Sequence, residues 1–333
     1  MPASLPLSGR ASTATAAATL VVAVVAVSAA SVLVGSRMVS PFELFSGSDA
    51  MSGIVEARVP RTAVGLTLGA ALGLAGACMQ GLTRNPLADP GILGVNAGAA
   101  FAMVVGLTVF GASQLNQYLW FAFAGAAVAT VAVHMLASLG RDGATPVKLA
   151  IAGAAMTAAL TSWTSAVLLL DRQTLEVFRL WQVGTIGGRY WSPLLTLAPM
   201  LAVGAALALV SARVLNTLTL GEDMARGLGR HTTRDRLIVG LAIVLLSGGA
   251  TALAGPVAFV GLIVPHLVRI VVGSDYARIL PFSMGYGAVL TLAADVVGRV
   301  VLPPAEVQVG IMTSVIGVPI FFWMIRRGRL GAL

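Results

Sequence analysis

Few side chains in this sequence have a type and spacing that could perform chemistry. The three histidines, His134, His231 and His266, are far apart and lack the spacing of metal-binding pairs. The single cysteine, Cys78, lies within an apolar run, so no disulfide or metal cluster is expected from it. The only lysine, Lys148, lacks the glycine-rich context of a Walker A loop. The sequence therefore predicts a non-enzymatic chain that holds no metal or cofactor.

One charged pair could serve ion-coupled transport. Asp295 lies in an apolar run, and Arg299 follows four residues later. At this spacing both side chains lie on one helix face, which favours a structural ion pair. A carboxylate within a membrane helix can instead couple transport to an ion gradient. An ion-coupled secondary transporter therefore remains an alternative at this point.

The composition indicates which solvent surrounds these residues. The 333-residue chain is 57% hydrophobic and 10% charged, with a mean hydropathy of +0.92. Soluble domains carry about 25% charged residues, so we expect a lipid bilayer around most of the chain. The basic residues are scattered between apolar runs and form no patch. No nucleic-acid partner is therefore expected, despite a pI near 10.9.

Ten apolar runs have about the length that a helix needs to cross a bilayer. Gly and Ala are abundant in every run, and small residues let helices pack closely in lipid. The sequence thus predicts an all-α polytopic membrane protein, a compact bundle of about ten transmembrane helices. The first run is too long for a signal peptide, and further runs follow it. The runs cover about 15–35, 59–82, 92–111, 116–139, 147–170, 191–214, 237–254, 256–273, 279–302 and 307–326.

The distribution of basic residues predicts the orientation. Ten spans place both termini on one side, and 14 of the 21 Arg and Lys residues then fall on that side, against 7 on the other. This bias favours cytoplasmic termini. We expect a cytoplasmic tail over 1–14, a membrane domain over 15–326 with a cytoplasmic loop at 215–236, and a second cytoplasmic tail over 327–333.

Two proline- and glycine-containing stretches interrupt the apolar pattern. One is "GLTRNPLADPGILGV" (81–95), where Pro86 and Pro90 each remove a backbone donor. The other is "GGATALAGPVAFVGLIVPHLVR" (248–269). The predicted topology puts these breaks on opposite sides, which suggests an inverted-repeat element. Prolines and glycines are also simply common in membrane helices, which is the alternative explanation.

Five blocks of the sequence resemble a known family. They are "RVPRTAVGLTLGAALGLAGACMQGLTRNPLADPGILGVNAGA" (58–99), "LGEDMARGLG" (220–229), "AGPVAFVGLIVPHLVR" (254–269), "ADVVGRV" (294–300) and "VGIMTSVIGVPIFFWMI" (309–325). Together they are similar to the permease subunits of cobalamin and ferric-siderophore ABC importers, the type II importers. The stretch "TRNPLADPGILGVNAGA" looks most like the ferric-enterobactin (catecholate) permeases.

This resemblance implies an importer of an iron–siderophore complex that works by alternating access in the bacterial cytoplasmic (inner) membrane. It implies two ATPase subunits that bind ATP and Mg, a second permease subunit, related or identical, and an extracytoplasmic siderophore-binding protein. The same machine carrying cobalamin, haem or another metal chelate stays open. A membrane scaffold without transport is a third alternative, and the broken helices argue against it.

The resemblance also assigns roles to residues by their positions in the matched blocks. Arg58, Arg61 and Arg299 would receive carboxylates of the binding protein, because guanidinium groups offer forked donors; lipid headgroups are the alternative partners. Asn85 and Leu87 match the cytoplasmic gate. The remaining assignments are Thr161 and Ser162 along the translocation path, and Gly221, Glu222, Asp223, Met224, Ala225, Leu228 and Gly229 for coupling to the ATPase.

For the coupling segment and the path residues, the residue types themselves also bear on the assigned role. Glu222 and Asp223 suit the start of a helix, and Met224, Ala225 and Leu228 could form one small apolar face. An ordinary basic loop that only anchors orientation is the alternative for this segment. For hydroxyl groups in an apolar span, bonding back to their own helix is the competing explanation.

Overall fold

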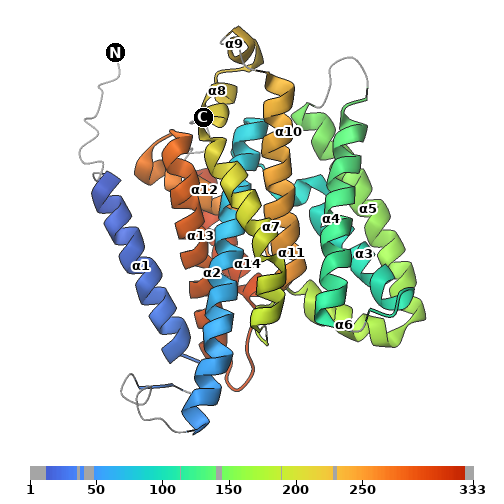
Figure 1. Ribbon diagram of the computed structural model, residues 1–333, viewed down its shortest axis with the longest axis vertical. Coiled ribbons are helices and arrows are strands. Elements are labelled where there is room, and N and C mark those ends of the chain that lie inside the picture. Colours follow the sequence, from blue (N-terminus) through green and yellow to red (C-terminus); the bar gives the residue numbers. More distant parts are fainter. Residues whose placement is uncertain are drawn as a thin grey trace.

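The computed structural model describes residues 13–35, 38–40, 49–112, 114–139, 145–188, 190–227 and 231–326, and the elements in this part of the chain are helices (Figure 1). Eight of these helices are long and apolar enough to cross a membrane, and two shorter apolar helices, Val95–Thr108 and Val260–Val272, accompany them. The prediction of an all-α polytopic protein with about ten transmembrane helices is thus confirmed.

The helices follow one another with short connections. In chain order they are α1 (Thr13–Leu33), α2 (Asp49–Thr83), the 3₁₀ turn η2 (Pro90–Leu93), α3 (Val95–Thr108), α4 (Leu115–Ala137), α5 (Pro146–Leu170), α6 (Arg172–Gln182), α7 (Trp191–Val210), α8 (Ala212–Thr219), α9 (Glu222–Gly227), α10 (Thr232–Ile243), the π turn η3 (Val244–Gly248), α11 (Gly249–Ala254), α12 (Val260–Val272), α13 (Tyr276–Val301) and α14 (Val309–Arg326). We call the two ends of the bundle the α9 end and the α6 end, after the helices that lie there (Figure 1).

Several boundaries differ from the predicted spans. Helix α2 begins at Asp49, whereas the apolar run predicted a start near residue 59. The predicted span 191–214 is divided at Ser211 between α7 and α8. Hydropathy locates the part of a helix that lies in lipid, but it does not detect polar turns that extend a helix beyond the lipid.

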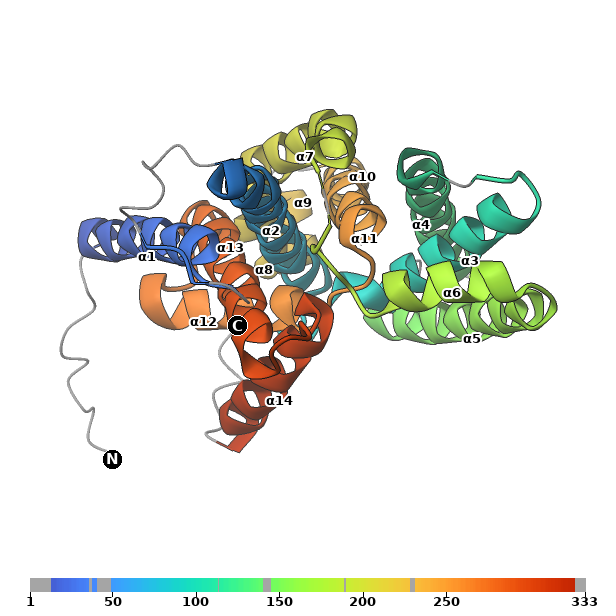
Figure 2. The same cartoon turned by 90° about the horizontal axis from the view of Figure 1, so that it is seen from below.

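Figure 2 shows α3, α4, α5 and α6 grouped on one side, and α1, α2, α12, α13 and α14 on the other, with α7, α10 and α11 between them. Helices α2 and α13 form the most extensive packing in the second group. Their backbones approach closely at glycines: a Cβ on Gly73 would lie 2.2 Å from the Ser283 carbonyl oxygen. This close approach is how small residues stabilise helix pairs in lipid.

Both predicted breaks are present and look alike. Helix α3 has 14 residues and α12 has 13, and each begins after a non-helical segment. Gly94 (φ 74°) and Gly255 (φ 81°) adopt left-handed conformations there that favour glycine. The second break is held in place because the Ala254 carbonyl accepts a hydrogen bond from Thr185 N at 2.7 Å. Helix α3 runs away from the α9 end and α12 runs toward it, as an inverted-repeat element requires (Figure 1).

Candidate functional sites

The loop at residues 84–89 connects α2 to η2, and local hydrogen bonds shape it. Asn85 N donates to the Gln80 carbonyl at 3.2 Å, and Asn85 Oδ1 accepts from Leu87 N at 2.9 Å. Arg84 has a φ of 51°, so the chain turns sharply directly after α2. Asn85 therefore holds the turn with its own side chain, and Leu87 is left exposed at its tip.

A groove runs along α5 beside this loop. Its volume is about 850 Å³, and its lining residues are Ile92, Ala150, Gly153, Ala154, Thr157, Ala158, Thr161, Ser162 and Ser165. Ile92 belongs to η2, and a Cβ on Gly153 would lie 1.8 Å from the Ile92 carbonyl oxygen, so η2 and α5 are in direct backbone contact. The predicted path residues Thr161 and Ser162 thus line the same groove as the end of the 81–95 stretch.

The groove has an uncharged lining. All nine lining residues are apolar, Gly, Ser or Thr. The Ser162 hydroxyl donates to the Ala158 carbonyl of its own helix at 2.8 Å, and Ser165 donates to the Thr161 carbonyl at 2.9 Å. Such bonds within one helix are the alternative to a role in the translocation path that the sequence left open. Each hydroxyl oxygen can still accept a hydrogen bond from the groove.

The predicted coupling segment, 215–236, contains the end of α8, all of α9 and the start of α10. Gly221 (φ 104°) precedes α9, and the backbone of Glu222 and Asp223 forms its first turn. Met224 is exposed whereas Ala225 is fully buried, so the two differ in burial, and the apolar face expected from Met224, Ala225 and Leu228 stays a prediction. Leu228 and Gly229 lie outside the described residues.

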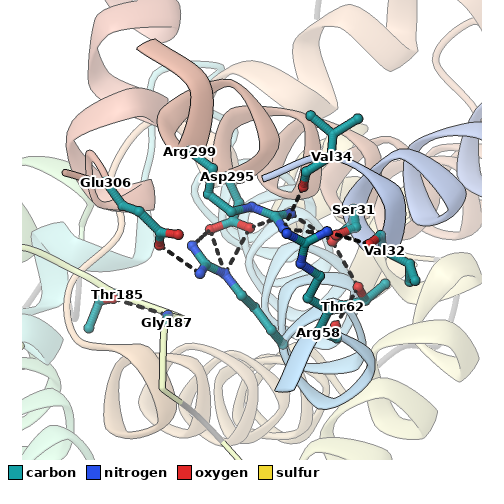
Figure 3. A network of polar contacts seen from close by, with 11 residues as sticks. Ser31, Val32, Val34, Arg58, Thr62, Thr185, Gly187, Asp295, Arg299 and Glu306 are labelled. Atoms are coloured by element: carbon teal, nitrogen blue, oxygen red, sulfur yellow. Dashed lines mark hydrogen bonds and ion pairs between the residues drawn. The ribbon is translucent and has the colours of Figure 1, made fainter. Parts of the chain in front are cut away.

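A cluster of charged residues, here called the arginine cluster, comprises Arg58, Arg61, Asp295, Arg299 and Glu306 (Figure 3). Asp295 is 1% exposed and accepts hydrogen bonds from Arg61 Nη2 at 2.8 Å and Nε at 3.1 Å. Arg299 Nη2 lies 3.0 Å from Asp295 Oδ2, the oxygen that also accepts from Arg61 Nε, which confirms the predicted pair. Glu306 is 37% exposed and accepts from Arg61 Nη1 at 2.7 Å.

Two of these arginines also cap helix α1. Arg299 donates to the carbonyls of Ser31 at 2.8 Å and Val34 at 3.0 Å, and Arg58 donates to the Val32 carbonyl at 2.8 Å (Figure 3). The last carbonyls of a helix have no partners within it, and positive charge suits that end. Arg299 is only 2% exposed, so it lies in the interior, whereas the role in docking implied by the family resemblance requires an accessible side chain.

The segment after α5, which contains Phe178 and Trp181, is the helix α6. Asp171 caps it: its carboxylate accepts from Gln173 N and from the Thr174 hydroxyl, and the Thr174 bond is the main reason that the pKa of Asp171 lies below its usual range. Phe178 and Trp181 are buried against the bundle.

Comparison with known proteins now decides the family. Residues 18–327 match the model of the FecCD transport family. The chain belongs to the FecCD family. It is 43% identical over 319 residues to the ferric enterobactin transport system permease FepD of Escherichia coli, which covers 94% of this chain and 95% of FepD. It is 44% identical over 286 residues to the Fe(3+)-citrate import system permease YfmD of Bacillus subtilis, with 86% and 85% of the two chains covered.

A solved structure agrees with this assignment. A metal-chelate type ABC transporter in an inward-facing conformation superposes with a TM-score of 0.83 at 26% identity, covering 95% of this chain and 99% of that one. This FecCD protein is therefore a permease subunit of a siderophore or metal-chelate ABC importer, and separate subunits hydrolyse ATP. The family resemblance seen in the sequence is confirmed, and an ion-coupled transporter is no longer needed as an alternative.

Sequence reasoning missed several polar residues in the interior contacts of this FecCD permease. They are Gln80 and Tyr276, which are buried, and Asn216 and Arg269, which are half-buried; the four hydrogen-bond one another across four helices. Gln80 and Arg269 lie inside two of the family-like blocks, and each stands near the end of an apolar run. A polar side chain near the end of an apolar run needs a hydrogen-bond partner once it is buried, so these positions could have been predicted to form polar contacts.

Proposed function

We propose that this permease moves a ferric siderophore across the bacterial cytoplasmic membrane and that a ferric catecholate is its cargo. The similarity to FepD, 43% identity over nearly all of both chains, carries the proposal. The stretch at 83–99, which looks like the catecholate permeases, includes Ile92 of the groove. No cofactor is needed in this chain, and ATP and Mg would bind to the partner ATPase subunits.

The uncharged groove suits a bulky chelate that must be released. A transporter has to bind its cargo well enough to admit it and weakly enough to let it leave. Small and hydroxyl side chains along α5 offer many weak contacts and no fixed charge, so they provide space rather than a tight cage. Thr161 and Ser162 would lie along the path.

The proposed assembly has two ATPase subunits, a second permease subunit that is a related chain or an identical copy, and an extracytoplasmic siderophore-binding protein. The α9 end would face the cytoplasm, as the distribution of basic residues indicates. Gly221 to Ala225, with Leu228 and Gly229, would contact the ATPase. Alternating access would open and close the path at the 84–89 loop, with Asn85 and Leu87 at the cytoplasmic gate.

The binding protein would dock at the arginine cluster. Arg61 keeps 14% of its side chain exposed, and its Nη1 is held by the more exposed Glu306, so a carboxylate of the partner can replace Glu306 there. Arg58 would supply a second guanidinium. Arg299 is interior and would act by holding Asp295, which orients Arg61.

Uptake into proteoliposomes tests the function. The permease, its ATPase and its binding protein are reconstituted, and iron-labelled ferric catecholate is supplied with the binding protein. Uptake should require ATP and the ATPase, and persistent uptake without the ATPase would refute the proposal. Excess unlabelled ferric citrate, haem or cobalamin should compete poorly. Ferric citrate is the second candidate, favoured by the 44% identity to YfmD, and strong competition by it would reassign the cargo.

Docking is tested by two opposite changes. Arg58→Glu combined with Arg61→Glu should weaken association with the binding protein while the ATPase still co-purifies. Glu306→Gln removes the carboxylate that occupies Arg61 Nη1, so association should become tighter. Unchanged association in both variants would refute docking at this cluster.

A further inference from the structure

A chain of hydrogen bonds begins in α8, at the edge of the predicted coupling segment. Asn216 Nδ2 donates to Asp275 Oδ1 at 2.7 Å, and Asn216 Oδ1 accepts from Tyr276 N at 2.9 Å. Asp275 caps α13 through a further bond from Ala277 N at 2.9 Å. One amide group therefore fixes α8 to the first turn of α13 through both a donor and an acceptor.

Arg269, in the last turn of α12, continues the chain from α13 to α2. Its Nη2 donates to the Tyr276 hydroxyl at 3.0 Å, and its Nη1 donates to Gln80 Oε1 at 2.6 Å. Tyr276 is 1% exposed and Gln80 is fully buried. Both acceptors are uncharged, so one guanidinium joins three helices through neutral oxygens.

Gln80 carries the chain to the 84–89 loop. Its Nε2 donates to the carbonyl of Leu262 at 3.0 Å, in the first turns of α12. Its backbone carbonyl accepts from Asn85 N at 3.2 Å. Gln80 therefore contacts Arg269 through its side chain and the first residues of the 84–89 loop through its backbone carbonyl.

Close packing leaves little space between the same elements. A Cβ on Gly81 would lie 2.8 Å from the Tyr276 ring and 2.9 Å from the Leu215 side chain of α8. A Cβ on Gly221 would lie 3.7 Å from Arg84 Nη1, so the start of the proposed gate loop borders the segment before α9. A shift of α8 must therefore be accommodated by α13 and α2, because tightly packed side chains transmit displacement.

We infer that Asn216, Tyr276, Arg269 and Gln80 transmit movement of the ATPase-coupling segment to the 84–89 loop. They are positioning residues, since none of them lines the groove. The inference rests on the proposed function, because it needs an ATPase that moves α8 and α9. The contacts form a continuous physical path whose ends lie at the two sites that must communicate.

Transport efficiency tests this relay. The variants Asn216→Ala and Arg269→Met are compared with Thr83→Ala, a control whose hydroxyl bonds to the Met79 carbonyl of its own helix. The measured quantity is ferric catecholate imported per ATP hydrolysed in the reconstituted complex. It should fall about 2- to 30-fold in the two relay variants and stay unchanged in the control. A merely structural defect would lower assembly, uptake and hydrolysis together and leave this ratio intact.

A second measurement does not depend on the cargo. Leu87→Cys, in a Cys78→Ala background, places one thiol on the loop, and its rate of maleimide labelling is measured with and without ATP and vanadate. The rate should depend on nucleotide in the Thr83→Ala control and lose that dependence in both relay variants.

Each outcome separates the relay from the proposed function. If either relay variant that co-purifies with the ATPase keeps the control's import ratio and nucleotide-dependent labelling, the relay is wrong. Arg269→Met keeps an unbranched apolar stem and removes the guanidinium, so it serves as the second variant should Asn216→Ala fail to assemble. If the control labels in a nucleotide-dependent way but imports no ferric chelate, the cargo proposal fails, and the relay stands provided that both relay variants lose the nucleotide dependence.

Discussion

Replacing Asp295 with Asn should destabilise the protein far more than replacing Glu306 with Gln, although both carboxylates bind Arg61. Asp295 is 1% exposed and also pairs with Arg299, which is 2% exposed, whereas Glu306 is 37% exposed. Removing one partner of a buried pair leaves an uncompensated charge and costs about 3–5 kcal/mol. Removing one partner of an exposed pair costs about 0–1 kcal/mol.

For Asp295→Asn we expect a cost near the lower end of the range for a broken buried pair. Arg299 keeps its hydrogen bonds to the Ser31 carbonyl and hydroxyl and to the Val34 carbonyl, so it is not left without partners. The asparagine oxygen can still accept one hydrogen bond. We expect a loss of about 3 kcal/mol in the free energy of unfolding.

The assay is equilibrium unfolding in mixed detergent and SDS micelles, followed by tryptophan fluorescence. The double variant Asp295→Asn/Arg299→Met removes both buried charges and should recover part of the loss, because a neutral pair of similar volume is often tolerated. Recovery should be incomplete, since Met cannot cap α1. If Asp295→Asn costs no more than Glu306→Gln, the reasoning that burial determines the cost is refuted.

Three further substitutions can be tested by the same unfolding assay. Gly73→Ala should cost about 1–3 kcal/mol because its Cβ would meet the Ser283 carbonyl, whereas Gly240→Ala, with open space around it, should stabilise α10 by up to about 1 kcal/mol; equal effects would contradict the proposed packing of α2 on α13. Asp275→Asn should reduce the loss of stability on acidification. The hydrogen bond from Asn216, followed by that from the Ala277 amide, holds the pKa of Asp275 below its usual value. Its contribution is therefore complete above about pH 3.9 and is lost as the pH falls through the lowered folded-state pKa; identical acid profiles for variant and parent would contradict this.

The number of spans, the two breaks and the Asp295–Arg299 pair could be predicted because each depends on neighbours within one turn or one run of sequence. The partners of Arg61 could not, because Asp295 lies 234 positions away along the chain. Gln80 and Arg269 are likewise 189 positions apart. Periodicity in a single sequence identifies which side chains are buried, but it does not indicate which buried side chains meet.

The interior position of Arg299 could have been predicted from the end of α1. Helix α1 ends at Leu33 among apolar residues that cannot cap it, so its last carbonyls required donors from elsewhere. An arginine near the end of another span can supply these donors. Counting unsatisfied carbonyls would have indicated an interior role for Arg299, whereas its position near the end of a span alone suggested an exposed one.

The two polar networks differ in chemistry, and this difference indicates where the protein moves. The arginine cluster holds buried opposite charges, and separating them within a membrane would expose each charge to lipid, so it should move as a rigid unit with α1, α2 and α13. The relay from Asn216 to Gln80 contains no pair of opposite charges, because Arg269 donates to the neutral oxygens of Tyr276 and Gln80. Hydrogen bonds of this kind contribute about 1.5–3 kcal/mol each, and a neutral acceptor can be exchanged for water or another neutral group. Rearrangement is therefore expected at the α9 end, between helices that are held by exchangeable bonds. The 84–89 loop lies beside those helices and not beside the fixed charges.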